Sequence, residues 1–273
     1  MAYTINGVDI SQYGIIPGRT DNSNIALSGW LDLPGRMGEI CHEWAEEDGA
    51  EPYVLADEID LAGIDIAFDG LIKGTKDLCL TKIESLLDDI SSATDTIILG
   101  TPYGNFNVYL KSLTTKQDQI ISEVNMIFRQ PVVNIQPILL PAIATEKNTF
   151  SGIPFSSFGL HLKSLPDYIV GELRAHDLTT YNAERYKKTK RGTRKVTLDC
   201  WLVAFSMSDF IEKCNQLRIY FSESGLKEIR LYDKLLLSAY AADGFSISEI
   251  NTSGNKVIAG FKIQLIVNSE SII

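Results

Sequence analysis

The sequence predicts an α+β, mainly β fold made of two β-sandwich or barrel units, each with one packed helix. Three observations lead to this prediction. A nine-residue pattern occurs twice, each half contains one amphipathic helical segment, and stretches of alternating apolar and polar residues flank both helical segments. The common order of these features indicates that one β-rich unit occurs twice in tandem.

The nine-residue pattern opens each half of the chain. Gly7–Ile15 reads GVDISQYGI and Gly152–Leu160 reads GIPFSSFGL. Both follow the order Gly, aliphatic, variable, apolar, Ser, polar, aromatic, Gly, aliphatic, at an offset of 145 residues. We therefore expect the two segments to occupy equivalent places in two equivalent units.

One helix is predicted in each half, near Asp77–Ile90 and Asp209–Phe221. In each segment the apolar residues recur at helical spacing and line one face, and the two segments align at an offset of 131 residues. A single helix cannot bury its own apolar stripe, so each helix is expected to pack against a sheet.

The strands are predicted from period-two alternation and from short apolar runs. In the first half they are Ile64–Phe68, Thr96–Leu99, Asn107–Leu110 and Ser122–Phe128, and in the second half Val196–Val203, Glu228–Leu231, Leu235–Tyr240 and Val257–Val267. The segment Gly70–Lys76 resembles a phosphate-binding loop only faintly, because three residues rather than four separate its glycines. We expect it to be a tight turn between strand and helix.

Three regions follow from this pattern. Residues 1–130 are predicted to form the first unit, and residues 150–273 the second. Between them, residues 131–149 carry Pro131, Pro137 and Pro141 in an extended apolar stretch, which is typical of a connector.

Charge divides unequally between the halves. Residues 1–146 hold 8 Lys and Arg against 22 Asp and Glu, whereas residues 147–273 hold 17 against 13, so the halves carry net charges of −14 and +4. The total of −10 argues against generic binding to nucleic acid or anionic membranes. No apolar run is long enough to span a bilayer, and no secretory signal opens the sequence.

The charge difference is concentrated in one loop of each half, between the opening pattern and the strand that precedes the helix. In the first unit this loop is acidic, with Glu43, Glu46, Glu47, Asp48 and Glu51. In the second unit it is basic, with Arg185, Lys187, Lys188, Lys190, Arg191, Arg194 and Lys195.

Residues with catalytic or metal-binding potential are scattered, and no enzyme is predicted. His42, His161 and His176 have no ligand-spaced companions, and no nucleophile elbow is present. We therefore expect no catalytic residues, no cofactor and no metal. Four separated cysteines favour reduced thiols in a cytoplasmic protein.

Short segments in both predicted units resemble a known protein family. NGVDISQYG at Asn6–Gly14, followed by PGRMG at Pro34–Gly38 and then by strand, helix and strands, resembles the amino-terminal domain of phage distal tail proteins, which share the tail-tube fold. The second unit, from SGIPFSSFG at Ser151–Gly159, is similar to another copy of that fold, although it lacks a PGRMG.

The resemblance implies a structural component of a phage, prophage or phage-like tail, a distal tail or hub ring around a channel for DNA. It implies a homo-oligomer, either a trimer of double units or a hexameric ring, with other tail proteins as partners, DNA only in transit and no membrane contact. The protein would occur in the bacterial host cytoplasm during assembly and then in the virion tail. In many distal tail proteins the second half is instead a carbohydrate-module-like sandwich, which the internal repeat disfavours here.

In such a ring the acidic and basic loops would attract each other across junctions between units, and Arg36 in the PGRMG segment joins them as a candidate assembly contact. The alternatives are two solvated loops without mutual contact, or a basic loop that faces a partner protein or passing DNA.

A second functional class is a β-sandwich that binds host-surface carbohydrate through exposed aromatics. Its candidates are Trp30, Trp44 and Trp201, although Trp201 lies in an apolar strand, which favours the core. A hydrolase assembled from scattered acids is the third and least favoured class.

Overall fold

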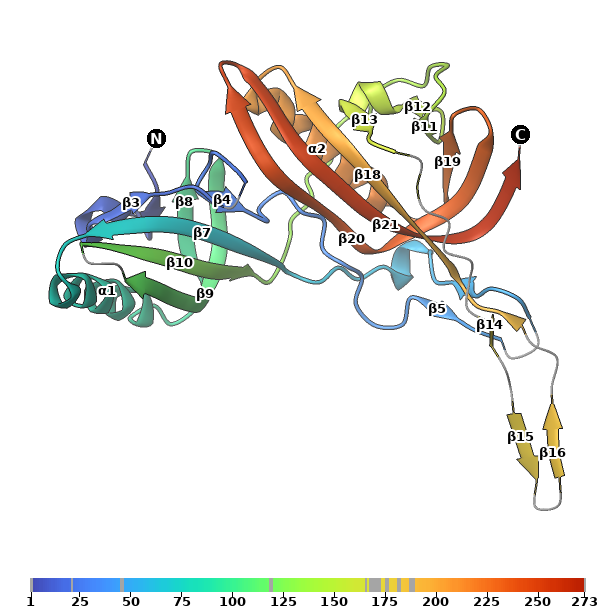
Figure 1. Cartoon of the computed structure of the whole chain (residues 1–273), viewed down its shortest axis with the longest axis horizontal. Coiled ribbons are helices and arrows are strands. Elements are labelled where there is room, and N and C mark those ends of the chain that lie inside the picture. The colour runs from blue at the N-terminus through green and yellow to red at the C-terminus, as the bar shows by residue number, and fades with distance from the viewer. Residues whose placement is uncertain are drawn as a thin grey trace. The chain divides into compact units, whose positions relative to one another are not determined.

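The fold is taken from a computed structural model (Figure 1). It describes residues 2–20, 22–44, 47–117, 120–164, 166, 173–174, 177–180, 183–186 and 190–272, with the backbone alone at 173–174, 177–180, 183–186, 190–191 and 272. Contacts between residues divide the chain into two compact units, which are described separately below. In the described part of the chain, no helix has the length and apolar character needed to cross a membrane.

The two units are not simply the two halves of the sequence. Unit 1 comprises Met1–Asp32, Gly63–Asn134 and Ile247–Gly254, and unit 2 comprises Leu33–Ala62, Ile135–Ser246 and Asn255–Ile273. The sequence predicted residues 33–62 in the first unit and residues 247–254 in the second. Their contacts group residues 33–62 with unit 2 and residues 247–254 with unit 1.

Unit 1 is an antiparallel sheet with one helix. The strand order is β2-β1-β8-β9-β10-β7-β3, and β4 also pairs with β7. A short 3-10 helix, Ile10–Tyr13, joins β2 to β3, and helix α1 (Lys76–Ser91) follows β7. The strands are β1 (Thr4–Ile5), β2 (Val8–Asp9), β3 (Ile15–Pro17), β4 (Leu27–Ser28), β7 (Ile64–Lys73), β8 (Ile97–Thr101), β9 (Gly104–Gln117) and β10 (Ile121–Gln130).

Unit 2 has a second antiparallel sheet with the order β12-β11-β19-β20-β21-β18-β13. The 3-10 helix Phe155–Phe158 joins β12 to β13, and helix α2 (Met207–Ser222) follows β18. The strands are β11 (Thr149–Phe150), β12 (Ile153–Pro154), β13 (Leu160–Leu162), β18 (Arg194–Ala204), β19 (Lys227–Leu231), β20 (Leu235–Ser253) and β21 (Lys256–Ile272). The end of β20, from Ile247, belongs to unit 1 by its contacts.

Among the described residues, unit 2 also contains three two-stranded ribbons. They pair β5 (Cys41–His42) with β6 (Glu51–Pro52), β14 (Leu173–Arg174) with β17 (Lys190–Arg191), and β15 (Asp177–Thr180) with β16 (Ala183–Tyr186). A 3-10 turn, Ala56–Glu58, follows β6.

The two sheets have the same strand order. Each element of the unit 1 path has a counterpart at the same place in the unit 2 path, and each helix connects counterpart strands, β7 to β8 and β18 to β19. The predicted class, α+β and mainly β with one helix in each half, is confirmed, as are both helix positions. The predicted turn at Gly70–Lys76 is wrong over most of its length, because β7 continues to Lys73.

Each helix packs its apolar stripe on its own sheet. In unit 1, Cys79, Ile83 and Leu86 are buried on α1, and Phe68 and Phe128 are buried on the sheet. The core of unit 2 is richer in aromatic rings, which contact one another in a chain from Phe155 through Phe150, Phe221 and Phe245 to Phe261. Burial of this apolar surface stabilises both units.

Hydrogen bonds attach the tip of the β20–β21 hairpin within unit 1. Asn24 donates from Nδ2 to the Thr252 carbonyl oxygen at 2.7 Å, and its Oδ1 accepts the Thr252 N–H at 2.9 Å. Ser23 Oγ accepts the Ile250 N–H at 2.9 Å, and Asp32 Oδ1 accepts the Ile247 N–H at 2.7 Å.

Segment 33–62 is fixed to unit 2 in a similar way. Leu33 and Phe245 form an isolated antiparallel bridge, with both N–H to carbonyl distances at 3.1 Å. Ile40 and Val54 pack against a buried cluster of Tyr240, Ala242 and Ile266.

Each short 3-10 helix ends on a glycine in the left-handed region. Gly14 has φ 68° and Gly159 has φ 70°. Each is covered by a lysine of the following α-helix, Lys82 or Lys213, at the offset of 131 residues that relates α1 to α2. The Val203 backbone lies closer to Gly159 than Lys213 does. The Val203 N–H donates to the Gly159 carbonyl oxygen at 2.8 Å.

Gly159→Ala is expected to lower the free energy of unfolding by about 2 kcal/mol or more, because its Cβ would collide with the Val203 carbonyl oxygen in addition to straining the backbone. Gly225→Ala in the same unit is the matched control, since Gly225 has φ 84° and open space around it. We expect Gly225→Ala to lower the free energy of unfolding by only about 1 kcal/mol, because it strains the backbone without a collision. Urea unfolding measures both, and equal losses would contradict the steric argument.

Candidate interaction site

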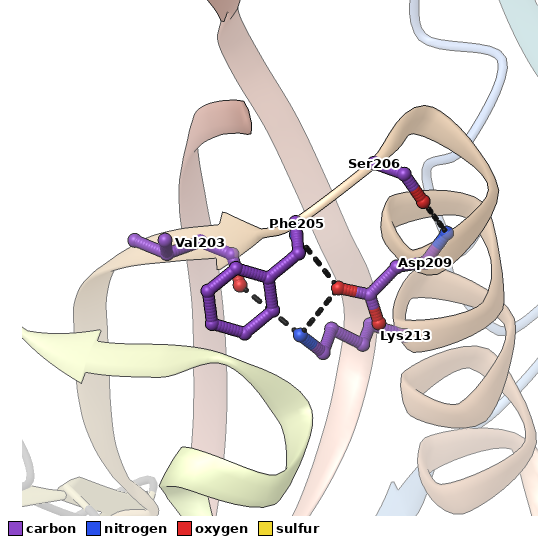
Figure 2. A network of polar contacts seen from close by, with 5 residues as sticks. All are labelled: Val203, Phe205, Ser206, Asp209 and Lys213. Atoms are coloured by element: carbon purple, nitrogen blue, oxygen red, sulfur yellow. Dashed lines mark hydrogen bonds and ion pairs between the residues drawn. The ribbon is translucent and has the colours of Figure 1, made fainter. Parts of the chain in front are cut away.

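The junction between β18 and α2 is fixed by a closed set of polar contacts (Figure 2). Ser206 caps the helix, because its Oγ accepts the Asp209 N–H at 3.0 Å. The Asp209 carboxylate accepts the Phe205 N–H at 2.8 Å. Lys213, one turn further, donates to the same carboxylate oxygen at 2.9 Å and to the Val203 carbonyl oxygen at 3.3 Å.

The charge of Asp209 is favoured by these contacts. Partial burial alone would raise the pKa of this carboxyl, but the Phe205 N–H and the Lys213 ammonium outweigh burial and hold the pKa below its usual value. The carboxylate therefore stays ionised at neutral pH and keeps the backbone before the helix in one conformation.

This junction presents an exposed apolar surface that sequence reasoning missed. Phe205 is 78% exposed, Trp201 40% and Ile258 37%, and Val203 pairs with Ile258 across β18 and β21. We call these four residues the aromatic face. The expectation that Trp201 lies in the core is wrong, because Cys200 and Leu202 take the buried side of the strand and period two turns Trp201 outward.

A lysine covers the Trp201 ring. Lys163 Nζ lies 3.9 Å from the ring centroid and also forms an ion pair with Asp199 at 2.8 Å. The cation contacts the aromatic ring favourably while its charge is balanced by the neighbouring carboxylate.

The predicted acidic loop forms the β5–β6 hairpin. Glu51 pairs with His42 across the two strands and its carboxylate accepts the Trp44 Nε1–H at 3.0 Å. Glu43, Glu47 and Asp48 belong to the same hairpin and each makes a further interaction, whereas Glu46 lies outside the described residues.

Arg36, the candidate contact in the PGRMG segment, is used inside unit 2. Its guanidinium donates to the Tyr53 carbonyl oxygen at 2.9 Å and lies 5.3 Å from the centroid of the Tyr240 ring. Burial lowers the pKa of Arg36 from its usual value. This side chain therefore fastens segment 33–62 to the sheet of its own unit.

The predicted basic loop is folded into ribbons rather than being an irregular loop. Arg185 lies in β16, and Lys190 and Arg191 form β17, whereas Lys187 and Lys188 lie outside the described residues. Arg194 and Lys195 open β18, and Arg194 forms an ion pair with Glu270.

The acidic and basic loops connect counterpart strands, β3 to β7 and β13 to β18, as the sequence predicted. By their contacts, however, the acidic hairpin and the basic ribbons are grouped in the same unit 2.

Unit 1 contains an open groove of about 990 Å³. Its floor is the outer face of β7, β9 and β10, where Asn125 Nδ2 donates to Asp69 Oδ1 at 2.7 Å. Its walls are residues 17–20, 23, 28 and 247–250. Among the described residues, no aromatic side chain lines it. The groove therefore lacks the flat apolar surface on which sugar rings commonly stack.

Reactive groups do not converge elsewhere in the part of the chain that the structure describes. No cluster of three His, Cys, Asp or Glu residues able to hold a metal is found among those residues. Burial and the nearby Asp199 raise the pKa of the Cys200 thiol to about 12, so this thiol stays protonated. Cys79 and Cys214 are also buried, and none of the four cysteines forms a disulfide.

No protein-family model matches the sequence, and neither does any curated protein. Among solved structures, the SPP1 Dit (gp 19.1) protein is described as a paradigm of the hub adsorption apparatus in phages that infect Gram-positive bacteria. It aligns with a TM-score of 0.37 and 11% identity, over 99% of this chain and 100% of that chain.

Asp209→Asn is expected to lower the free energy of unfolding by about 1–2 kcal/mol at pH 7, because charge-assisted bonds to Phe205 and Lys213 are lost. The pKa of Asp209 is lower in the folded than in the unfolded chain, so its contribution is complete above about pH 4 and disappears as the pH falls through the folded value. The difference between wild type and variant should therefore shrink below about pH 4 in urea titrations. Glu212→Gln, an exposed position on the same helix, is the control. A difference that stays constant from pH 7 to pH 3 would contradict the assignment.

Proposed function

We propose that the chain is a structural component of a phage, prophage or phage-like tail, a distal tail or hub ring that assembles around a channel. The observation that carries the proposal is the identical strand order of the two sheets, together with the resemblance of Asn6–Gly14 and Pro34–Gly38 to distal tail proteins. We further propose that the two units arose by tandem duplication. The offset of 145 residues relates β1, β2 and β3 to β11, β12 and β13 without a gap, which supports this origin.

In this proposal the protein is not an enzyme. It assembles as a homo-oligomer, a trimer of double units or a hexameric ring, and contacts other tail proteins, while DNA passes through the channel. It is made in the host cytoplasm and becomes part of the virion tail. The duplicated unit supports a trimer in particular, because three chains with two equivalent units each present six units around an axis.

The carbohydrate-binding alternative gains one specific observation, since Trp44 and Trp201 are exposed at 50% and 40%. It is weakened by the Lys163 ammonium, which lies over the face of Trp201 on which a sugar would stack. Trp30, the third candidate, is buried and stacks on Tyr103 in unit 1.

Purified protein is expected to form closed rings of three or six chains. Native mass spectrometry counts the chains, and negative-stain imaging shows whether the particles have a central hole. Particles without a hole, or a stable assembly with another number of chains, would contradict a ring of this type. Saturable binding of a host glycan by a monomer would favour the carbohydrate alternative.

The charged loops are proposed to set the order of units around the ring. Reversing Lys187, Lys188, Lys190 and Arg191 to Glu is expected to weaken assembly at low salt. Further reversal of Glu43, Glu46, Glu47 and Asp48 to Lys should partly restore it. Each exposed pair contributes only about 0–1 kcal/mol, so the loops affect register and encounter rate more than affinity.

Sedimentation at two ionic strengths measures these effects, because salt screens exposed charges. If the first set of reversals leaves both the oligomer size and its salt dependence unchanged, the loops do not pair between units.

A further inference from the structure

Helix α1 of unit 1 exposes apolar side chains on one flank. Leu80 and Leu87 are 44% and 38% exposed, and Glu84 lies between them at helical spacing. Asp77 and Asp88 border the same flank. We call these five residues the acidic helix face. The charged residues of the whole helix are Lys76, Asp77, Lys82, Glu84, Asp88 and Asp89, which give it a net charge of −2.

The corresponding flank of α2 is not exposed. At the offset of 131 residues, Leu80 and Leu87 correspond to Ile211 and Arg218, of which the first is half-buried and the second buried. The uncovered apolar flank is therefore a property of unit 1 alone.

The aromatic face of unit 2 has the opposite charge at its border. Lys256 and Lys262 extend from the same side of β21 as Ile258 and are exposed, and Lys163 lies over Trp201. Asp199, which pairs with Lys163 and lies opposite Lys262, offsets one of these three charges, so this border remains net positive. Unit 1 has no counterpart of Phe205, because Gly74 precedes its helix cap at the corresponding position.

We infer that the acidic helix face of one copy of this chain docks on the aromatic face of a second copy. Each face combines exposed apolar side chains with a charged border, and the two borders have opposite sign. Each chain carries each face once, so the contact is head-to-tail and leaves one free face at either end of a row of chains.

The contacts around Asp209 prepare the aromatic face for docking. They hold the backbone of Phe205, the most exposed residue of the face, before any partner arrives. Little conformational entropy of this backbone is then lost on binding. The inference deepens the proposed function by naming a surface through which neighbouring chains would meet, and it rests on that function only for closure into a ring.

Two double variants test the contact. Leu80→Lys with Leu87→Lys removes the apolar flank of α1 and adds charges that repel the lysine border. Phe205→Glu with Ile258→Glu does the same to the aromatic face, with charges that repel the acidic border. The matched controls are Ile120→Lys in unit 1 and Leu55→Glu in unit 2, at positions 71% and 62% exposed. Circular dichroism and urea unfolding check that every variant is folded.

In analytical ultracentrifugation each double variant is expected to lose all species larger than the monomer, whereas the controls keep the wild-type distribution. The decisive sample is an equimolar mixture of the two double variants. The intact helix face of one variant can then dock on the intact aromatic face of the other, so the mixture should form a pair and nothing larger.

A mixture that stays monomeric would overturn the inference, because it would place these faces in contact within one chain or with a different partner. Double variants that assemble like wild type, or a wild-type chain that is monomeric up to the highest soluble concentration, would also overturn it. If both double variants still form the same rings as the wild-type protein, this contact is ruled out but the proposed function is not. Head-to-tail pairs without ring closure would keep the contact and remove the ring.

Discussion

Burial of one amphipathic helix on one antiparallel sheet is the constraint on which the rest of each unit depends. The stripe of α1 or α2 is apolar on one side only and needs a sheet of several strands to cover it. Each chain segment that leads into a helix, β7 or β18, is also a strand of the sheet that receives that helix, one place in from the edge strand β3 or β13. The short connection between strand and helix fixes where the helix starts, and in unit 2 the Asp209 network does this with side-chain bonds.

Much of the fold could be predicted because it depends on local pattern. The helices were found from 3.6-residue periodicity, and the long strands from period two, since both patterns record which side of an element meets the core. The short pairs β1–β2 and β11–β12 have only two residues per strand, too few for a periodicity, and only the repeated glycine pattern marked their place. The grouping of 33–62 with unit 2 was not predicted, because it depends on contacts between residues about 200 positions apart, such as Leu33 with Phe245.

The candidate site was predicted less well, for a physical reason. Charge runs are visible in any sequence, so the acidic and basic loops were found, but their place in the structure depends on distant packing. The aromatic face was missed because the run Trp201-Leu202-Val203 was interpreted as uniformly apolar. Strict alternation from Val196 through Leu198 and Cys200 to Leu202 already places Trp201 on the opposite side. The exposure of Phe205 had no such signal, since it lies beyond the end of the strand.

The way in which chain segments are divided between the two units also affects the order in which the protein can fold. Unit 1 contains Ile247–Gly254, whose hydrogen bonds to Ser23, Asn24 and Asp32 link residues more than 200 positions apart. During synthesis the ribosome delivers residues 1–134 long before this hairpin tip. Domains generally fold as units, the amino-terminal one first, but here the first unit cannot be completed until nearly the whole second half has been translated. A nascent chain released early would have every strand of the unit 1 sheet but would lack the hairpin tip that bonds to Ser23, Asn24 and Asp32, and its unit 2 sheet would be incomplete. Both units are therefore completed together near the end of translation.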